Sequence, residues 1–339
     1  MTSTSTSATP AAAPAAAPAP ASADLDLADG VHVVLGAGPV GWAIATELAN
    51  RGAAVRLVTR SGSGPEHRRI ERVARDVSST AGAIAGCADA AVVYGAAQPA
   101  YHRWPQEFPG LQAAILAGAE AAGAVYVAVE NLYAYGPVDG PMTEDLPLRP
   151  TTRKGRVRAR LAEELVEAHR SGRVRTTAGR ASDFFGPHVA GSVVGERFFP
   201  PILAGKAVSV LGDPSTRHTF TYAPDLARAL IVLGSREEAW GRAWHVPNPE
   251  TTTIAAFAER AYAAAGTTGR VRATPAWALR LAGLVVPAAR ETVEMRYEFE
   301  EDFVVDDSAV RAAFGLAATP LDEALADTVA WWRAHEARG

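Results

Sequence analysis

Residues 31–41 read VHVVLGAGPVG, and this stretch decides the fold of the chain. A short β-branched run leads into Gly36-x-Gly38-x-x-Gly41, and a helical pattern, WAIATELANRG, follows. A strand, a glycine turn and a helix in this order are the context of a dinucleotide-binding site. Gly36 permits the tight turn, Gly38 lets the backbone approach a pyrophosphate, and Gly41 lets helix and strand pack closely. The first N–H groups of the helix are then available to the phosphates.

Composition narrows the class of protein. Of the 339 residues, 48% are hydrophobic and 21% charged, which predicts a packed core. The net charge of −4 argues against a nucleic-acid or membrane-surface partner. The single cysteine, Cys87, allows no internal disulfide, fits a cytoplasmic location and is expected to be buried. Residues 1–29 form an Ala/Pro-rich tail that we expect to be disordered, and no run predicts a membrane span.

The pattern after the glycine turn predicts an α/β fold with a Rossmann-type, doubly wound parallel sheet. Strand-like runs stand at 31–35, 54–58, 72–77, 90–94, 124–129 and 174–180. Helical patterns stand between them, the longest at 40–50, 106–122 and 153–171. The ligand should lie beyond the carboxyl ends of the strands. We predict a dinucleotide-binding domain over 30–187 and, over 188–339, a smaller α+β substrate lobe that returns some elements to the sheet.

Several motifs follow in a recognisable order. They are GAGPVG (36–41), RDV (75–77), NLYAYGP (131–137), TEDLPLRP (143–150), RASDFFGP (180–187) and HTFTYAPDLARAL (218–230). With them, the chain from 31 to 333 resembles the short-chain dehydrogenase/reductase superfamily, specifically its extended branch of NAD-dependent epimerases and dehydratases. The first motif is GxGxxG where that branch usually has GxxGxxG, which points to its atypical group. The resemblance also implies a homodimer that pairs through the helices at 106–122 and 153–171.

The end of the second strand bears on the choice of cofactor. An NAD site usually has a carboxylate here to bind the ribose 2′-OH, whereas this strand ends Val58-Thr59-Arg60-Ser61. Arg60 can bind a 2′-phosphate with its planar donors, so we predict NADP(H) rather than NAD(H). The alternatives are that Arg60 is a solvated arginine and that Asp76, at the family's adenine contact, is a turn residue. The implied cofactor-binding residues are Gly36, Gly38, Pro39, Val40, Gly41, Thr59, Arg60, Asp76, Val77, Ala96, Ala97, Asn131 and Arg158.

The proton-transfer positions of the family are altered. The family uses Ser/Thr, Tyr and Lys, and its Ser/Thr position falls on Asn131, whose amide can still hydrogen-bond a carbonyl. The Tyr-x-x-x-Lys signature is absent. In the helix TTRKGRVRARLAEEL the favoured register places Lys154 at the Tyr position and Arg158 at the Lys position, where it would bind the ribose. A shift of two residues would select Arg156 and Arg160 instead.

Two residues are candidates for the missing acid. A desolvated Lys154 beside Arg158 would have a lowered pKa and could serve as the acid. Tyr133, on the loop after the fifth strand, is the other candidate, because the Tyr135 position usually belongs to the packing of that loop. The alternative interpretation is a solvated basic helix start formed by Arg153, Lys154, Arg156, Arg158 and Arg160.

The substrate positions differ from those of sugar-nucleotide members. Asp183 stands where those members have an Asn that helps to bind the diphosphate, and its charge would repel a phosphate. Their Arg-Asp-Phe run is matched here by His218-Thr219-Phe220. We therefore expect a small, partly apolar carbonyl or alcohol rather than a nucleotide sugar. The candidate substrate contacts are Gln98, Tyr101, His102, Trp104, Tyr135, Asp183, Phe184, Phe185, Arg217 and Phe220, with core packing as the alternative for the aromatic ones.

These observations predict an NADP(H)-dependent oxidoreductase, a reductase, dehydrogenase or epimerase-like enzyme with a small-molecule substrate. Asn131, with Tyr133 or Lys154, would polarise and protonate the substrate oxygen. No metal site is expected, because the sequence has no HxH or CxxC motif. Two alternatives stay open. One is a non-redox cyclase, isomerase or lyase that retains a bound nucleotide, and the other is a non-catalytic sensor of NADP(H).

Overall fold

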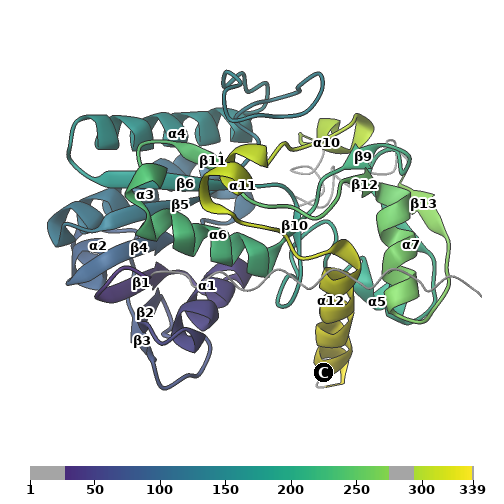
Figure 1. Ribbon diagram of the computed structural model, residues 1–339, viewed down its shortest axis with the longest axis horizontal. Coiled ribbons are helices and arrows are strands. Elements are labelled where there is room, and N and C mark those ends of the chain that lie inside the picture. The colour runs from purple at the N-terminus through teal and green to yellow at the C-terminus, as the bar shows by residue number, and fades with distance from the viewer. Residues whose placement is uncertain (1–26, 275–293, 338–339) are drawn as a thin grey trace, which may run out of the picture.

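A seven-stranded parallel sheet forms the centre of the computed structural model, which describes residues 27–274 and 294–337 (Figure 1). The expected disordered tail, residues 1–29, lies outside these residues except for its last three. The strand order β11-β6-β5-β4-β1-β2-β3 places β1 and β4 side by side at the switch point of a doubly wound fold. The strands are β1 (Val31–Leu35), β2 (Ala54–Thr59), β3 (Ile70–Ala74), β4 (Ala90–Gly95), β5 (Val125–Asn131), β6 (Arg175–Ala181) and β11 (Ala243–His245).

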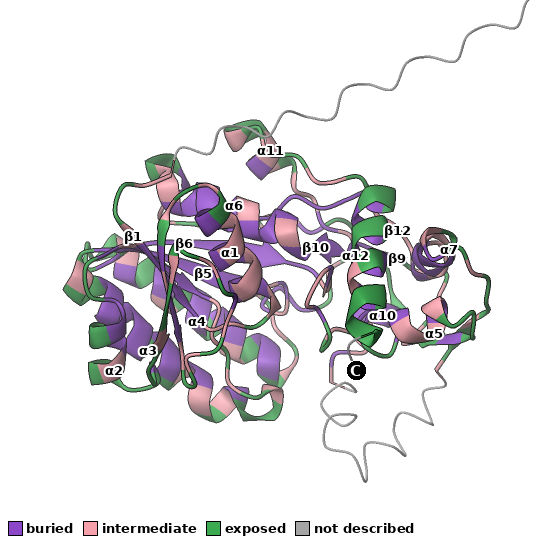
Figure 2. Cartoon of the chain, turned by 90° about the horizontal axis from the view of Figure 1, so that it is seen from below, coloured by how far each residue is buried: buried purple, intermediate pink, exposed green. Residues whose placement is uncertain are grey.

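Helices cover both faces of this sheet, which is why its central strands read as nearly continuous apolar runs. On one face, α1 (Pro39–Asn50) and α6 (Ala223–Ser235) pack against each other and on the strands. The opposite face carries α2 (Thr80–Gly86), α3 (Trp104–Ala122) and α4 (Arg153–Arg170). Figure 2 shows the buried strands between these two helical layers. The predicted Rossmann-type fold is confirmed.

The second half of the chain forms a smaller lobe with a core of its own (Figure 1). Its helices are α5 (Phe199–Leu203), α7 (Ile254–Ala264), α10 (Tyr297–Glu300) and α12 (Leu321–Glu336), whereas α11 (Ser308–Phe314) returns to the edge of the central sheet and packs on Trp244 of β11. Three two-stranded sheets pair β7 (Phe184–Phe185) with β10 (Thr221–Tyr222), β8 (Val208–Val210) with β13 (Val271–Ala273), and β9 (Arg217–His218) with β12 (Thr252–Thr253). Two 3-10 turns complete the described elements, η1 (Tyr101–Arg103) and η2 (Glu237–Ala239).

The structure corrects two details of the strand pattern. The third strand ends at Ala74 rather than at residue 77, because Asp76 Oδ1 accepts the Ser78 N–H at 2.9 Å and starts a turn. The seventh strand, β11, was not predicted, since its three residues show no alternation long enough to detect. Cys87 is buried as expected, and burial raises the pKa of its thiol to about 11. Among the described helices, none is both long and apolar enough to cross a membrane.

Candidate active site at the carboxyl ends of the strands

The three glycines of the first turn have distinct surroundings. A Cβ on Gly36 would lie 2.8 Å from the Ala97 backbone, and one on Gly41 would lie 2.0 Å from the Gly36 carbonyl oxygen. A Cβ on Gly38 would meet nothing within 4 Å, and Gly38 is exposed. No side chain caps the N-terminus of α1, so its first N–H groups remain available. The site has room for a dinucleotide pyrophosphate, which the backbone N–H groups of Gly38, Val40 and Gly41 could hold.

The next two strand ends place Arg60 beside Asp76. Arg60 is exposed directly after β2, and no carboxylate stands at that strand end. The hydrogen bonds from Ser78, with a smaller contribution from the Arg60 charge, lower the pKa of Asp76. Asp76 is therefore a turn residue, and the Arg60 guanidinium lies close enough to affect its pKa. The other cofactor candidates line the same edge: Thr59 ends β2, Val77 follows β3, and Ala96 and Ala97 follow β4 against Gly36.

Asn131 and Tyr133 stand where β5 ends. Asn131 Oδ1 accepts the Tyr133 backbone N–H at 3.3 Å, which leaves the amide N–H groups as the donors that Asn131 can offer a ligand. The Tyr101 hydroxyl donates to the Tyr133 hydroxyl at 3.3 Å. Burial raises the pKa of Tyr133 well above its usual value, so this phenol stays protonated at neutral pH. Both side chains can therefore offer hydrogen bonds to an oxygen.

The basic start of α4 presents two faces. Lys154 and Arg158 are 1% and 4% exposed, whereas Arg156 and Arg160 are exposed to solvent. Spacing of four residues keeps each pair on one side of the helix. The interpretation of a solvated basic helix start is therefore wrong for Lys154 and Arg158. The register that selects these two is the one that faces the sheet.

A glutamate from the second lobe binds Lys154. Lys154 Nζ lies 3.0 Å from Glu294 Oε2, and Glu294 Oε1 also accepts the backbone N–H groups of Arg153 and Lys154 at the start of α4. Burial alone would raise the pKa of Glu294, but the hydrogen bonds from Lys154 outweigh it and the pKa is lowered. Lys154 Nζ also lies 4.4 Å from the centre of the Tyr101 ring. Lys154 is thus held in a buried ion pair between the lobes.

Arg158 lies among aromatic side chains. Its guanidinium carbon is 4.4 Å from the centre of the Trp104 ring and 4.6 Å from that of Phe108, and Nη1 donates to the Val129 carbonyl at 3.2 Å. Burial lowers the pKa of Arg158 to about 10, which still leaves it charged at neutral pH. Within the described part of the chain, its buried Nε has no hydrogen-bond partner. That donor suits the ribose contact implied for this position.

Two more residues complete this edge: Glu298, which the sequence did not single out, and His218, which it matched only to the family's Arg-Asp-Phe run. Glu298 on α10 is 1% exposed, and burial together with the nearby Asp183 charge raises its pKa well above the usual value. His218 on β9 lies 3.1 Å from Asp183 Oδ2 and 3.1 Å from the Glu298 carbonyl oxygen. Tyr101, Tyr133 and Tyr297 all lie within electrostatic range of Asp183 and Glu298. Glu298 stands in the acidic run EFEED, which gave no sign of burial.

The buried carboxyl of Glu298 predicts a pH-dependent stability. The folded chain keeps this proton above pH 4.5, where an unfolded glutamate has lost it, so stability falls as pH rises from 4.5 toward the folded pKa. The Glu298→Gln variant should lack this fall and gain up to about 1.4 kcal/mol over wild type per pH unit in that window. Urea unfolding from pH 4 to pH 8 measures it. Exposed Glu301→Gln is the control, and parallel curves for wild type and Glu298→Gln would contradict the expectation.

Several candidate substrate contacts lie elsewhere. Phe185 and Phe220 are core residues of the second lobe, with ring centres 5.2 and 4.3 Å from that of Phe257, and Phe184 packs beside the core of the α1 and α6 layer. Arg217 is exposed and pairs with Asp302 at 2.8 Å, because it alternates with inward-facing His218 on β9. The structure keeps Phe184, Phe185 and Arg217 away from the site, whereas the Phe220 ring also lies 4.5 Å from the His218 ring and borders it.

The candidate substrate contacts that follow β4 also fall into two groups, one exposed and one packed toward the site. Gln98 and His102 are exposed, whereas Tyr101 and Trp104 pack toward Lys154 and Arg158. Tyr135 is 1% exposed and hydrogen-bonds Arg180 and His245 at 2.7 and 2.9 Å, so it belongs to packing rather than to a substrate pocket.

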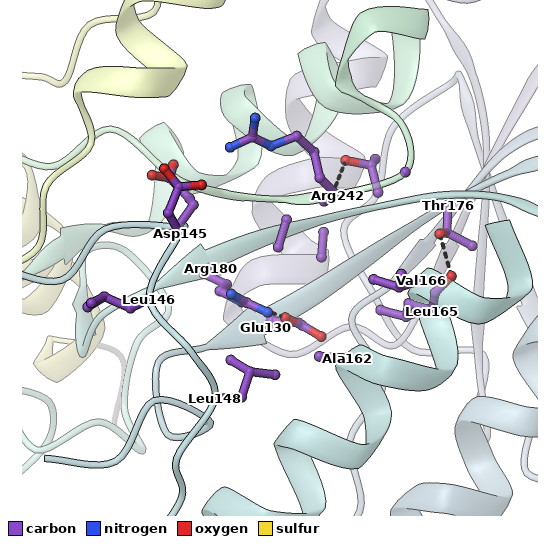
Figure 3. A pocket seen from close by; sticks show the side chains of 15 residues that line it. Glu130, Asp145, Leu146, Leu148, Ala162, Leu165, Val166, Thr176, Arg180 and Arg242 are labelled. Carbon is purple, nitrogen blue, oxygen red and sulfur yellow. Dashed lines mark hydrogen bonds and ion pairs between the residues drawn. The ribbon is translucent and has the colours of Figure 1, made fainter. Parts of the chain in front are cut away.

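Tyr135 contacts a second polar cluster, which is formed by Arg180 and Glu130. Arg180 Nε donates to Glu130 Oε2 at 2.9 Å, and both side chains are buried. They line a pocket of about 390 Å³ bounded by α4, β6, β11 and the loop at residues 144–148 (Figure 3). The pocket was not predicted from the sequence. In the residues that the structure describes, no group of three His, Cys, Asp or Glu side chains could hold a metal ion.

The doubly wound sheet and the open glycine turn define a dinucleotide-binding protein of the Rossmann class. The family described as "NAD dependent epimerase/dehydratase family" matches residues 32–246, and the chain belongs to this family. It is an enzyme family of oxidoreductase-like chemistry that depends on a nicotinamide dinucleotide. No curated protein sequence matches the chain.

Solved structures share the fold at low sequence identity. The UDP-glucose 4-epimerase of Thermotoga maritima, solved with UDP-glucose, aligns with a TM-score of 0.76 at 17% identity, covering 90% of this chain and 99% of that one. An epimerase of Methanothermobacter thermautotrophicus gives 0.76 at 18%, over 91% and 94%. The dTDP-glucose 4,6-dehydratase of Streptomyces venezuelae, solved with NAD, gives 0.73 at 17%, over 91% and 98%. At these identities the likeness shows the fold.

Proposed function

We propose that this protein is an NADP(H)-dependent oxidoreductase of a small, partly apolar carbonyl or alcohol compound. The observation that carries the proposal is that Asn131 and Tyr133 lie at the same sheet edge as the open glycine turn, both with donors to offer. The bound nicotinamide would supply or accept a hydride at the substrate carbon. The glycine turn would hold the pyrophosphate, and Arg60 would bind the 2′-phosphate.

The chain's own groups then act on the substrate oxygen. The Asn131 amide and the Tyr133 hydroxyl would donate hydrogen bonds to it and stabilise the negative charge that develops as the carbon is reduced. Lys154, whose Nζ is held by Glu294, is assigned to orienting the Tyr101 ring and closing the lobes rather than to proton transfer. Buried aromatic side chains around Arg158 would keep water from the reacting carbon.

We further propose that the substrate is not a nucleotide sugar, although structures with the same fold were solved with UDP-glucose or named for dTDP-glucose. Asp183 lies at this edge beside Glu298, and Lys154 and His218 are each paired with a carboxylate. A diphosphate would therefore have to compete with Glu294 for Lys154 and with Asp183 for His218. A neutral carbonyl compound carries no such penalty.

Arg60 provides the test of the cofactor. Wild type should bind NADPH at least about tenfold more tightly than NADH, since a charge-assisted contact to the 2′-phosphate contributes roughly 1.5–3 kcal/mol. Arg60→Met should weaken NADPH binding by that factor and leave NADH binding unchanged. Energy transfer from tryptophan to the reduced nicotinamide reports both affinities. Arg170→Met, an exposed arginine at the opposite end of α4, is the control; equal affinities for the two cofactors in wild type would overturn the NADP(H) assignment.

A further inference from the structure

His218 and Asp183 form a buried pair whose hydrogen bonds fix where a proton must be. The imidazole Nδ1 lies 3.1 Å from the Glu298 carbonyl oxygen, which can only accept, so Nδ1 carries a hydrogen. The other ring nitrogen, Nε2, lies 3.1 Å from Asp183 Oδ2. With Nδ1 protonated, a neutral imidazole and an ionised carboxylate would set two lone pairs against each other. One further proton must therefore lie between Nε2 and Oδ2.

The surroundings stabilise this extra proton. The His218 ring stacks on Phe299 and Phe303, with centres 5.0 and 5.1 Å away, and aromatic faces attract a cation. The titratable groups around the pair are the carboxyl of Glu298 and the phenols of Tyr101, Tyr133 and Tyr297. Burial raises the pKa of each of these four groups, which favours their neutral forms around the pair.

The two members of the pair differ in access. The His218 side chain is 0% exposed, whereas the Asp183 side chain is 16% exposed and follows β6 at the edge where β5 brings Tyr133. Solvent and ligands therefore reach the proton through Asp183. His218, which is buried behind Asp183, can then transfer its own proton to the Asp183 carboxylate.

We propose that the Asp183–His218 pair is the acid–base group of this site. It takes the place of the signature tyrosine, which is absent from α4. This inference rests on the proposed oxidoreductase function. In the reducing direction the bound cofactor would supply a hydride to the carbonyl carbon, the π electron pair would move to the oxygen, and the oxygen would take the proton from Asp183. The carboxylate and a neutral His218 remain, and water restores the proton. Tyr133 and Asn131 bind the oxygen but return to their starting protonation state.

Nitrogen NMR of protein labelled with 15N-histidine tests the proposal without a substrate. His218 should show hydrogens on both ring nitrogens at pH 7, and Asp183→Asn should lower the midpoint at which the second proton is lost by about 1–3 pH units. Asp302→Asn, which removes the carboxylate partner of neighbouring Arg217, is the matched control and should leave the signal unchanged. His218→Gln assigns the signal among the eight histidines. An unprotonated Nε2 in wild type would overturn the proposal.

A second readout separates this inference from the proposed function. The positive nicotinamide ring of NADP+ beside the pair should lower the His218 midpoint relative to the NADPH complex. Equal midpoints in the two complexes would show that the pair lies away from the reacting carbon and would overturn its acid–base role while leaving cofactor binding intact. A protein that binds neither cofactor would instead overturn the proposed function, with the protonation state of His218 still readable in the free chain.

Discussion

Gly38→Asp is expected to abolish NADPH binding while the protein remains folded. A Cβ at Gly38 would meet nothing within 4 Å, and the backbone at φ −65° and ψ 178° suits any residue, so the substitution is sterically tolerated. Aspartate is also a favourable N-cap and would hydrogen-bond the first turn of α1. Its carboxylate would lie where the pyrophosphate must approach. Like charges brought together cost several kcal/mol, so affinity should fall by about 100-fold or more.

The measurement is the same tryptophan energy transfer, with circular dichroism to verify the fold. Gly110→Asp makes a matched control, because a Cβ at this exposed position on α3 also meets nothing within 4 Å. The control should bind NADPH like wild type. Undiminished binding by Gly38→Asp would mean that this turn does not hold the pyrophosphate.

Arg180→Leu is expected to produce the largest loss of stability. The side chains of Arg180 and Glu130 are 8% and 5% exposed, and Glu130 would be left as a buried, unpaired carboxylate. Tyr135 would also lose the donor that Arg180 Nη1 provides at 2.7 Å. Breaking a buried pair from one side costs about 3–5 kcal/mol in the free energy of unfolding. Urea unfolding at pH 7 measures this difference.

Two further variants show whether the unpaired charge is the cause. Replacing both partners, Arg180→Leu with Glu130→Leu, should recover much of the lost stability, because no buried charge then remains. Arg170→Leu breaks an exposed pair with Glu167 and should cost at most about 1 kcal/mol. A single variant Arg180→Leu as stable as Arg170→Leu would show that Glu130 is hydrated or protonated in the folded protein.

The dinucleotide-binding half was predictable because its signals are local. The glycine turn at 36–41 and the alternation of strands and helices each depend on neighbouring residues, and the observed strands differ from the expected ones mainly where Asp76 starts a turn. The family motifs also predicted which residues would bind the cofactor and which residues of α4 would take the Tyr and Lys positions. Lys154 and Arg158 lie on the inward face of α4, but the basic residues at the start of this helix gave no local sign of which face that would be.

The proton-transfer end of the site depends on contacts between distant residues. Glu294 reaches Lys154 across 140 positions, and Glu298 reaches His218 across 80. A charged residue in an acidic run is normally solvated, so nothing in the sequence marked Glu298 as buried. The aromatic residues Phe185 and Phe220 were ambiguous for the opposite reason. Their type fits either a substrate pocket or a core, and the second lobe has used them for its core.

The central sheet can be completed only after its edge strand, β11, has been synthesised. Residues 243–245 can pair with β6 only after the ribosome has passed residue 245, well beyond the predicted boundary of the nucleotide half at residue 187. Until then the outer edge of β6 exposes unpaired N–H and C=O groups, which are a template for pairing with other chains. A nascent or truncated chain that stops near residue 187 would carry this open edge without α6 covering the neighbouring face. The nucleotide half therefore depends on sequence that lies beyond residue 187.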